Sequence, residues 1–362
     1  MSTTTISCLQ ISSKHNIDFG YNLSSASKLR CKLDNVKKYC VSDSSSSSSL
    51  SMQAKSNKTK ISDTYSSLSS ATFGVRDCCV LLSEVLSGRM VSDNVFRQVF
   101  KIRSYETGPR RTALIDTLMK FIQEPALNHL MTTGLCDDMY TTPIMSAHNL
   151  IWVVTKLQFE VDRYPSRYDV VQVDHWKSLP GKNNMSCKWL LHDYQTGEIL
   201  ARALANWVVM NKETRRLSKF PDDVRAELAP YVVDTTLPIQ EMTRKYNKKL
   251  NINDVVHVRN GLMATWNDLD TNQHVNNVKY TQWILESVPN WIMEKYELAN
   301  MTLEYRRECT IGSLLQSQTF VLETDNTSGT VDCQHLLQFE GESSGVIMKG
   351  MTIWRPKRES FH

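Results

Sequence analysis

Two stretches of this 362-residue chain follow the same order of sequence features, and this internal repeat restricts the fold more than any other property. A shift of 162 positions places residues 100–124 over residues 262–286. Farther along, a shift of 144 places residues 163–165 over 307–309, and shifts of 146 to 147 relate later segments. Each match is weak alone, but together they keep their order, which predicts a tandem duplication of one folding unit.

Each copy is expected to have the same order of elements, which is one strand, one long helix and then several antiparallel strands. Positions Val278, Thr281, Leu285 and Val288 recur every three or four residues, which is helical spacing, and Pro289 ends the run. A sheet that wraps a helix buries it on most sides, so the sequence predicts an α+β fold. Segments with β-branched and aromatic residues in partial alternation are expected to be strands, at residues 157–161, 170–176, 188–192, 201–210, 301–306, 316–322, 335–339 and 347–354.

The segment between the copies is charged and contains Pro221, Pro230 and Pro238, so an exposed connection is expected there. These features predict a division into six parts. They are a leader at 1–70, a lead-in segment at 71–94, a first domain at 95–211, the connection at 212–260, a second domain at 261–356 and a tail at 357–362.

The first seventy residues differ from the rest of the chain in composition. They carry nine Lys and Arg against four Asp and Glu, and residues 44–49 are all Ser. A basic, Ser-rich, acid-poor leader is typical of an organelle transit peptide, plastid or mitochondrial, which is removed on import. The alternative is a disordered linker without a targeting role.

Several classes of protein are excluded or disfavoured by absent patterns. No apolar run approaches the ~20 residues of a membrane-spanning helix. The nine cysteines form no CxxC pair and no zinc-like spacing, which favours free thiols in a reducing compartment. Motifs of nucleotide-binding proteins, zinc peptidases and serine hydrolases are also absent. No cofactor, metal ion or nucleic acid is therefore expected.

A dense polar cluster directly precedes the helix of the second copy. Between positions 267 and 277 lie four Asn, two Asp, one Gln and one His. Helix capping by Asn or Asp is the ordinary explanation of such residues. However, the cluster holds more polar groups than one helix start needs, and a helix N-terminus can stabilise an oxyanion beside a base or nucleophile. The cluster therefore favours acyl transfer chemistry, with Asp270, Asn272 and His274 as candidates.

The repeat places this chemistry in the second copy alone. Under the 162 shift, Asp270, Asn272 and His274 fall opposite Gly108, Arg110 and Thr112. Under the 144 shift, Glu308 and Cys309 fall opposite Tyr164 and Pro165. Residues kept only for folding would tend to occur in both copies, whereas a single active site needs them once. We therefore interpret the second copy as catalytic.

These residues lie in longer motifs, which are DLDTNQHVNNVKY at 268–280, WILE at 283–286, LEYRREC at 303–309, IRSYE at 102–106, NLIWVV at 149–154, WVVMNK at 207–212 and TRRLSK at 214–219. Together these motifs resemble the plant plastidial acyl-acyl carrier protein thioesterases, and the resemblance extends from residue 95 to residue 354. Two further runs, EPALNH at 124–129 and DCQHLL at 332–337, are closer to the branch that prefers saturated chains than to the oleoyl branch, although Pro125 stands where Thr is expected.

The resemblance implies two tandem hot-dog domains, each a long helix wrapped by an antiparallel β-sheet. It implies that the first domain shapes the acyl pocket and that the second is catalytic, in the chloroplast stroma. The implied reaction releases a free fatty acid from acyl carrier protein that carries a phosphopantetheine-linked acyl chain. An acyl-coenzyme A thioesterase and a non-catalytic acyl-binding protein remain alternatives, and a homodimer is left open. Carried over by position, the implied catalytic set is Asp270, Asn272, His274, Glu308 and Cys309.

Thioester hydrolysis needs a nucleophile, oxyanion stabilisation and a proton for the departing thiol. We hypothesise that Asp270 is nucleophile or general base, that Asn272 and N–H groups at the helix start hold the carbonyl, and that His274 with Glu308 positions or activates water. A nucleophilic Cys309 with His274 and Asn272 is the rival hypothesis. It ranks lower, because the negative charge of Glu308 disfavours a neighbouring thiolate.

Acyl carrier proteins are acidic, yet residues 71–362 carry 33 Lys and Arg against 34 Asp and Glu. Attraction must therefore come from a local patch. Two clusters are candidates, each weighed against an ordinary solvated surface. They are Arg215, Arg216 and Lys219, and Arg244, Lys245, Lys248 and Lys249.

Overall fold

The computed structural model describes residues 84, 87–136, 141–233, 257–270, 273–322, 329–341 and 345–357. The expected leader, most of the lead-in segment, and the basic cluster from Arg244 to Lys249 lie outside the described residues. No helix among the described residues is long and apolar enough to cross a membrane.

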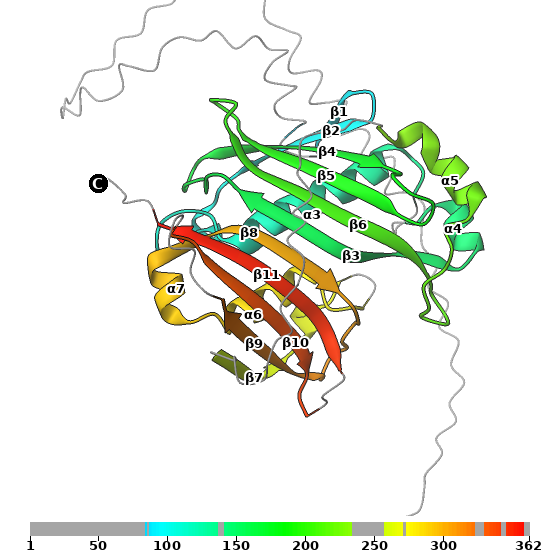
Figure 1. Cartoon of the computed structure of the whole chain (residues 1–362). Helices are drawn as coiled ribbons and strands as arrows, with labels where there is room; N and C mark the ends of the chain where they lie inside the picture. Colours follow the sequence, from blue (N-terminus) through cyan, green and yellow to red (C-terminus); the bar gives the residue numbers. More distant parts are fainter. Residues whose placement is uncertain are drawn as a thin grey trace, which may run out of the picture. The chain divides into compact units, whose positions relative to one another are not determined.

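Eleven strands of the described residues form one antiparallel sheet, with the order β1-β2-β4-β5-β6-β3-β8-β11-β10-β9-β7 (Figure 1). The first half contributes β1 (Arg89–Ser92), β2 (Val95–Lys101), β3 (Leu150–Val161), β4 (Val170–Ser178), β5 (Met185–Asp193) and β6 (Ile199–Asn211). The second half contributes β7 (His257–Met263), β8 (Tyr296–Tyr305), β9 (Leu314–Val321), β10 (Val331–Phe339) and β11 (Val346–Pro356).

The sheet confirms the tandem arrangement, because the two halves repeat each other at the predicted offsets. Helix α3 (Ile115–Thr132) and helix α6 (Asn277–Leu285) begin 162 positions apart, as do β2 and β7. Strands β4 and β9 begin 144 positions apart, β5 and β10 begin 146 apart, and β6 and β11 begin 147 apart. The strand order runs outward from the central β3–β8 pair with matching strands on each side. The fold is thus the α+β tandem hot-dog architecture that was expected.

Helices α3 and α6 lie against one side of the sheet and supply much of its core (Figure 1). In α6, Trp283 is 2% exposed and Ile284 is fully buried. Burying a side chain of this size contributes about 1.5–3 kcal/mol. In α3, the Phe121 ring stacks on Phe100 of β2 with ring centroids 4.4 Å apart. Both helices are therefore held in place mainly by apolar burial against the strands.

The central seam joins β3 to β8 over only part of their length. The two strands pair from Lys156 opposite Glu304 to Glu160 opposite Asn300. An irregularity in the pairing of β3 with β6 lies between Val154 and Lys156, where Thr155 is the extra residue. The remaining part of β3, towards Leu150, pairs with β6 alone among the described strands. The two halves of the sheet therefore diverge beyond Lys156.

The described part of the connection that follows β6, residues 212–233, includes buried side chains. Helix α5 (Asp222–Leu228) follows β6, and Phe220, Val224 and Leu228 are buried. They pack against helix α4 (Pro143–Ala147) and β3, in a small core that includes Met145, Leu150 and Val209. The short elements that complete the fold are η1 (Ser104–Glu106), η2 (Ala229–Tyr231), η4 (Trp266–Asp268) and α7 (Asn290–Lys295).

Candidate active site

The polar cluster forms a tight loop between η4 and α6. Leu269 pairs with Val275 as an isolated β-bridge. The backbone N–H of Asp270 donates to the carbonyl of His274 at 2.7 Å, and the N–H of His274 donates to Asp270 Oδ1 at 3.0 Å. The loop reverses through Gln273, which has a φ of +62°. Asp270 and His274 are therefore held next to each other at the start of α6.

A different residue caps the helix. The Asn276 side chain accepts a hydrogen bond from the N–H of Val278 at 2.9 Å, which satisfies one of the free donors at the helix start. A capping box closes η4, where the Asp268 carboxylate accepts from the N–H and the hydroxyl of Thr265. The capping alternative is thus correct for Asn276 and Asp268. It does not account for His274, and Asn272 lies outside the described residues.

The second part of the site follows the end of β8. The N–H groups of Arg306 and Arg307 both donate to the carbonyl of Ile347 on β11, which fixes the chain as it leaves the sheet. Glu308 comes next, and its Oε2 lies 3.9 Å from Nε2 of His274. The structure therefore brings Glu308, His274 and Asp270 together from two separate segments of the second half.

Cys309 lies beside this group but faces another residue. Its side chain is 1% exposed, and its thiol and its backbone N–H both donate to the hydroxyl oxygen of Tyr280, each at 3.3 Å. Burial, followed by the nearby charge of Glu308, raises the pKa of the Cys309 thiol above its ordinary value. Burial likewise raises the pKa of Tyr280. The thiol is therefore held in its protonated form, which is a poor nucleophile.

Arg215 completes the site, although the sequence placed it in a surface cluster. Its guanidinium forms an ion pair with Glu308, and its Nη2 lies 3.3 Å from Nε2 of His274. Arg216 and Lys219, from the same cluster, are exposed. No pattern in the sequence distinguishes Arg215 from these neighbours, because its partners are 59 and 93 positions away.

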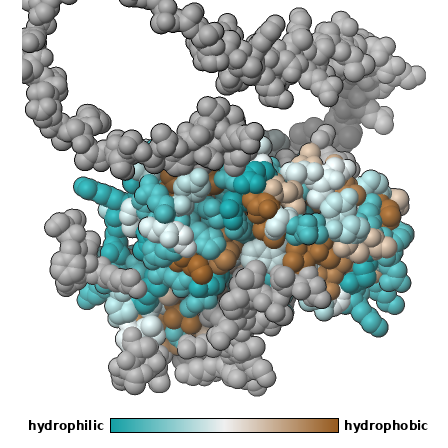
Figure 2. Space-filling view, turned by 90° about the horizontal axis from the view of Figure 1, so that it is seen from above, coloured by the Kyte–Doolittle hydropathy of each residue, from teal (hydrophilic) through white to brown (hydrophobic). Residues whose placement is uncertain are grey.

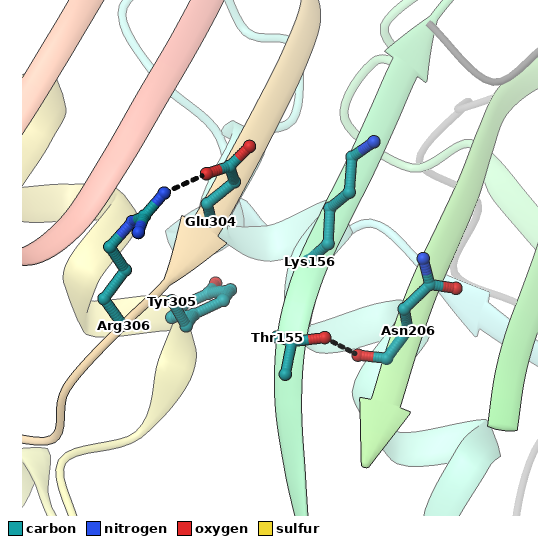
Figure 3. Close-up of a pocket in the computed structure, with 6 residues that line it drawn as sticks. All are labelled: Thr155, Lys156, Asn206, Glu304, Tyr305 and Arg306. Carbon is teal, nitrogen blue, oxygen red and sulfur yellow. Dashed lines mark hydrogen bonds and ion pairs between the residues drawn. The ribbon is translucent and has the colours of Figure 1, made fainter. Parts of the chain in front are cut away.

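An open pocket lies where β3 and β8 diverge (Figure 3). Its lining includes Thr155, Lys156 and Asn206 from the first half, and Glu304, Tyr305 and Arg306 from the second. Arg306 is two positions before Glu308, so the pocket adjoins the chain segment that carries the candidate site. Arg306 is paired with Glu304 at 2.9 Å, and the Thr155 hydroxyl donates to the Asn206 carbonyl at 3.1 Å.

The described residues contain no group of three or more His, Cys, Asp or Glu side chains that could hold a metal ion. The arrangement of a carboxylate, an imidazole and a second carboxylate paired with a guanidinium can move protons and orient water at one end of α6. Such a set has the groups that hydrolysis of an activated acyl bond requires.

Comparison with known proteins gives matches over both halves. Residues 93–228 match the family model described as the acyl-ACP thioesterase N-terminal domain, and residues 253–356 match the corresponding C-terminal domain. A palmitoyl-acyl carrier protein thioesterase, chloroplastic, of Arabidopsis thaliana is 51% identical over 276 residues, which is 75% of this chain and 66% of the relative. A dodecanoyl-[acyl-carrier-protein] hydrolase, chloroplastic, of Cinnamomum camphora is 46% identical over 73% of this chain and 68% of the relative.

Among solved structures, the 12:0-ACP thioesterase from Umbellularia californica matches with a TM-score of 0.68 and 43% identity, over 73% of this chain and 95% of that chain. A putative oleoyl thioesterase from Lactobacillus plantarum has a TM-score of 0.62 at 21% identity, over 74% of this chain and 99% of that chain. At this identity the match supports the fold alone. The chain spans 66% of the length of the Arabidopsis relative.

Proposed function

Because this chain belongs to the acyl-ACP thioesterase family, we propose that it hydrolyses the thioester of long-chain acyl-acyl carrier protein. The products are a free fatty acid and acyl carrier protein with a free phosphopantetheine thiol. The observation that carries the proposal is the meeting of Asp270, His274 and Glu308 at the start of α6, in a chain that matches both family domains.

In the proposed reaction, water attacks the thioester carbonyl and loses a proton to a base. Asp270 is the candidate for this base, or for a nucleophile that water later releases, and His274 with Glu308 orients or activates the water. The oxyanion that forms is held by Asn272 and by the N-terminal end of α6, whose dipole favours negative charge. Collapse of this intermediate breaks the carbon–sulfur bond, and the base returns its proton to the departing thiolate.

The same proposal assigns different roles to the two halves. The catalytic residues all lie in the second domain, residues 261–356, whereas the first domain, residues 95–211, shapes the pocket for the acyl chain. The absence of an equivalent set in the first half supports this division, since Gly108, Arg110 and Thr112 stand at the matching positions. Residues 212–260 connect the domains, and residues 1–70 act as the transit peptide.

The substrate is proposed to be a saturated acyl chain on acyl carrier protein in the chloroplast stroma. The names of the relatives support this choice, because they specify palmitoyl and dodecanoyl chains and a chloroplastic location. An acidic carrier protein needs a local basic surface, and the exposed Arg216 and Lys219 are the described candidates. Where it is coloured, the face shown in Figure 2 carries hydrophilic areas together with hydrophobic patches.

A panel assay tests the proposal. The purified chain without residues 1–70 is offered palmitoyl-, stearoyl-, oleoyl- and dodecanoyl-acyl carrier protein, and the same acyl groups on coenzyme A, while thiol release is followed. We expect turnover on the carrier-bound saturated chains and much lower kcat/KM on coenzyme A esters. Comparable rates on coenzyme A would favour the coenzyme A thioesterase, and acyl binding without turnover would make the protein an acyl-binding module.

A further inference from the structure

Arg215 reaches from the segment after β6 into the candidate site of the second repeat. Its guanidinium is paired with the Glu308 carboxylate, and its Nη2 lies 3.3 Å from His274 Nε2. The side chains of Arg215, Glu308 and His274 are 35%, 33% and 31% exposed. The three groups thus share one partly covered contact, which joins the segment after β6 to the second repeat.

The backbone around Arg215 is built to hold it there. Strand β6 ends at Asn211, whose Oδ1 accepts hydrogen bonds from the N–H groups of Glu213 at 3.1 Å and Thr214 at 2.8 Å. The N–H of Arg215 then donates to the Asn211 carbonyl at 3.0 Å, and the N–H of Asn211 donates to the Arg216 carbonyl at 2.9 Å. Arg215 has a φ of +54°, a left-handed conformation that is unfavourable for a side chain of this size. The turn therefore fixes a strained residue against the site.

The contact with His274 has a chemical consequence. A guanidinium carries N–H donors and no acceptor, so it can approach Nε2 favourably only when that nitrogen has a free lone pair. A neutral imidazole with its proton on Nδ1 meets this condition, whereas an imidazolium would face the guanidinium with a second donor. The contact therefore selects one tautomer of His274.

We propose that Arg215 is a positioning residue for the hydrolytic site. It fixes Glu308 beside His274 through the ion pair, and its guanidinium donates to Nε2 of His274, which favours the tautomer with the proton on Nδ1. This inference rests on the proposed thioesterase function, and it takes Arg215 out of the surface cluster to which the sequence assigned it. The segment that follows the first repeat then contributes to the chemistry of the second.

The test is a double-mutant cycle on the chain without residues 1–70, assayed with palmitoyl-acyl carrier protein. The variants are Arg215→Met, Arg215→Lys, Glu308→Gln and the double variant Arg215→Met with Glu308→Gln. Lys212→Met removes an exposed cation from the same turn and is the matched control. The melting temperature of every variant is measured alongside kcat and KM.

We expect Arg215→Met to lower kcat by roughly ten- to a hundredfold with little change in KM, as expected when a reacting group is misplaced by about 1 Å. Arg215→Lys should retain more of kcat than Arg215→Met, because Lys keeps the positive charge although it lacks the planar guanidinium. The double variant should be no slower than Glu308→Gln alone, since Arg215 would act through Glu308. Lys212→Met should keep the wild-type kcat.

Other outcomes overturn the inference. If the double variant loses kcat by the product of the two single losses, Arg215 acts independently of Glu308. A raised, salt-dependent KM with unchanged kcat would make Arg215 a docking residue. Loss of folding in both Arg215 variants would make it a structural anchor. An inactive wild-type chain would instead overturn the proposed function itself, and with it any positioning role in that reaction.

A spectroscopic measurement tests the tautomer directly. Nitrogen-15 chemical shifts of the His274 ring distinguish the Nδ1–H tautomer from the Nε2–H tautomer and from the imidazolium. We expect the Nδ1–H form in the wild-type chain at pH 7 and a mixture in Arg215→Met. A wild-type ring with its proton on Nε2, or an unchanged spectrum in the variant, would contradict the assignment.

Discussion

The hydroxyl oxygen of Tyr280 accepts hydrogen bonds from both the backbone N–H and the thiol of Cys309, at 3.3 Å each. Tyr280 lies on α6 and Cys309 follows β8, so this contact fixes the segment after the strand against the helix. The thiol is thus used as a buried donor. Its burial and its hydrogen bond to α6 suit a structural role.

Replacement of Cys309 by Ala should leave most of the activity. Burial and the neighbouring Glu308 raise the pKa of the thiol, so the nucleophilic thiolate is scarce at neutral pH. We expect kcat within about threefold of wild type and a modest fall in melting temperature, because a buried side chain and one hydrogen bond are lost. A collapse of kcat in a variant with wild-type stability would restore Cys309 as the nucleophile.

Replacement of Asp270 by Asn should abolish turnover and spare the fold. The side-chain oxygen of Asn can still accept the hydrogen bond that the His274 N–H makes to Oδ1 of Asp270, so the loop should keep its shape. The amide cannot serve as a base or as an anionic nucleophile, and we expect kcat to fall by about a hundredfold or more. Circular dichroism and melting temperature verify the fold. Wild-type rates in Asp270→Asn would remove this residue from the mechanism.

Acidification should destabilise the protein through its buried histidines. His335 is 1% exposed, and its ring nitrogens lie 2.9 Å from the Thr319 hydroxyl and 2.7 Å from the Thr352 hydroxyl. Burial lowers the pKa of His335 from 6.5 to about 3. Between these values the unfolded chain binds one more proton at this site, so stability falls as the pH falls from about 6.5 to about 3. One such group contributes a slope of about 1.4 kcal/mol per pH unit.

The measurement is urea unfolding of wild type and His335→Gln at several pH values across this window. His335→Gln should have a lower free energy of unfolding than wild type at pH 7. Its free energy of unfolding should also fall less steeply on acidification, by the slope that one titrating group contributes. His257→Gln, at an exposed position on β7, should keep the wild-type slope. Equal slopes in wild type and His335→Gln would mean that this histidine is not held neutral by the fold.

The repeat made most of the architecture predictable from sequence. Offsets of 162, 144 and 146 to 147 positions identified matching segments before any strand was placed, and the strand starts fall at these offsets. A strand was expected before the helix of each copy, but its bounds could not be given. Six of the seven residues of β7 are exposed, which leaves no alternation of buried and exposed positions to detect. In β2, Arg97 and Gln98 interrupt the apolar residues.

The candidate site was predictable where it is local and unpredictable where it is not. Asp270 and His274 are four positions apart in a dense run of polar residues, so the sequence already placed them in one loop. Arg215 meets them only through the pairing of two distant segments, and its neighbours Arg216 and Lys219 have the same charge. Composition can show that a basic cluster exists, but tertiary packing decides which member turns inwards.

Charge reversal of the outward members tests the docking surface. Arg216→Glu with Lys219→Glu should raise KM for acyl-acyl carrier protein severalfold at low ionic strength, while kcat stays near wild type. Added salt should shrink the difference from wild type, because it screens exposed charges. Lys295→Glu, an exposed position on α7, is the control for a general change of net charge. An unchanged KM in the double variant would assign these residues to the ordinary solvated surface.

Helix α3 contains a proline in its interior, and removing it should stabilise the protein. Pro125 is buried within the helix Ile115–Thr132, where its ring replaces the N–H that would otherwise donate to the carbonyl of Phe121. A proline inside a helix costs about 3 kcal/mol relative to Ala. Removing the proline from the helix should recover this cost, but Pro125→Ala also loses the packing of the buried ring, which opposes the gain. We therefore expect a net increase of about 1–2 kcal/mol in the free energy of unfolding.

Urea unfolding of Pro125→Ala and Pro125→Thr separates these two contributions. Thr has a poorer helix propensity than Ala but fills more of the space that the ring leaves, so the two variants should differ little if packing and propensity offset each other. If both variants unfold at lower urea than wild type, packing of the proline ring against the sheet outweighs the missing hydrogen bond.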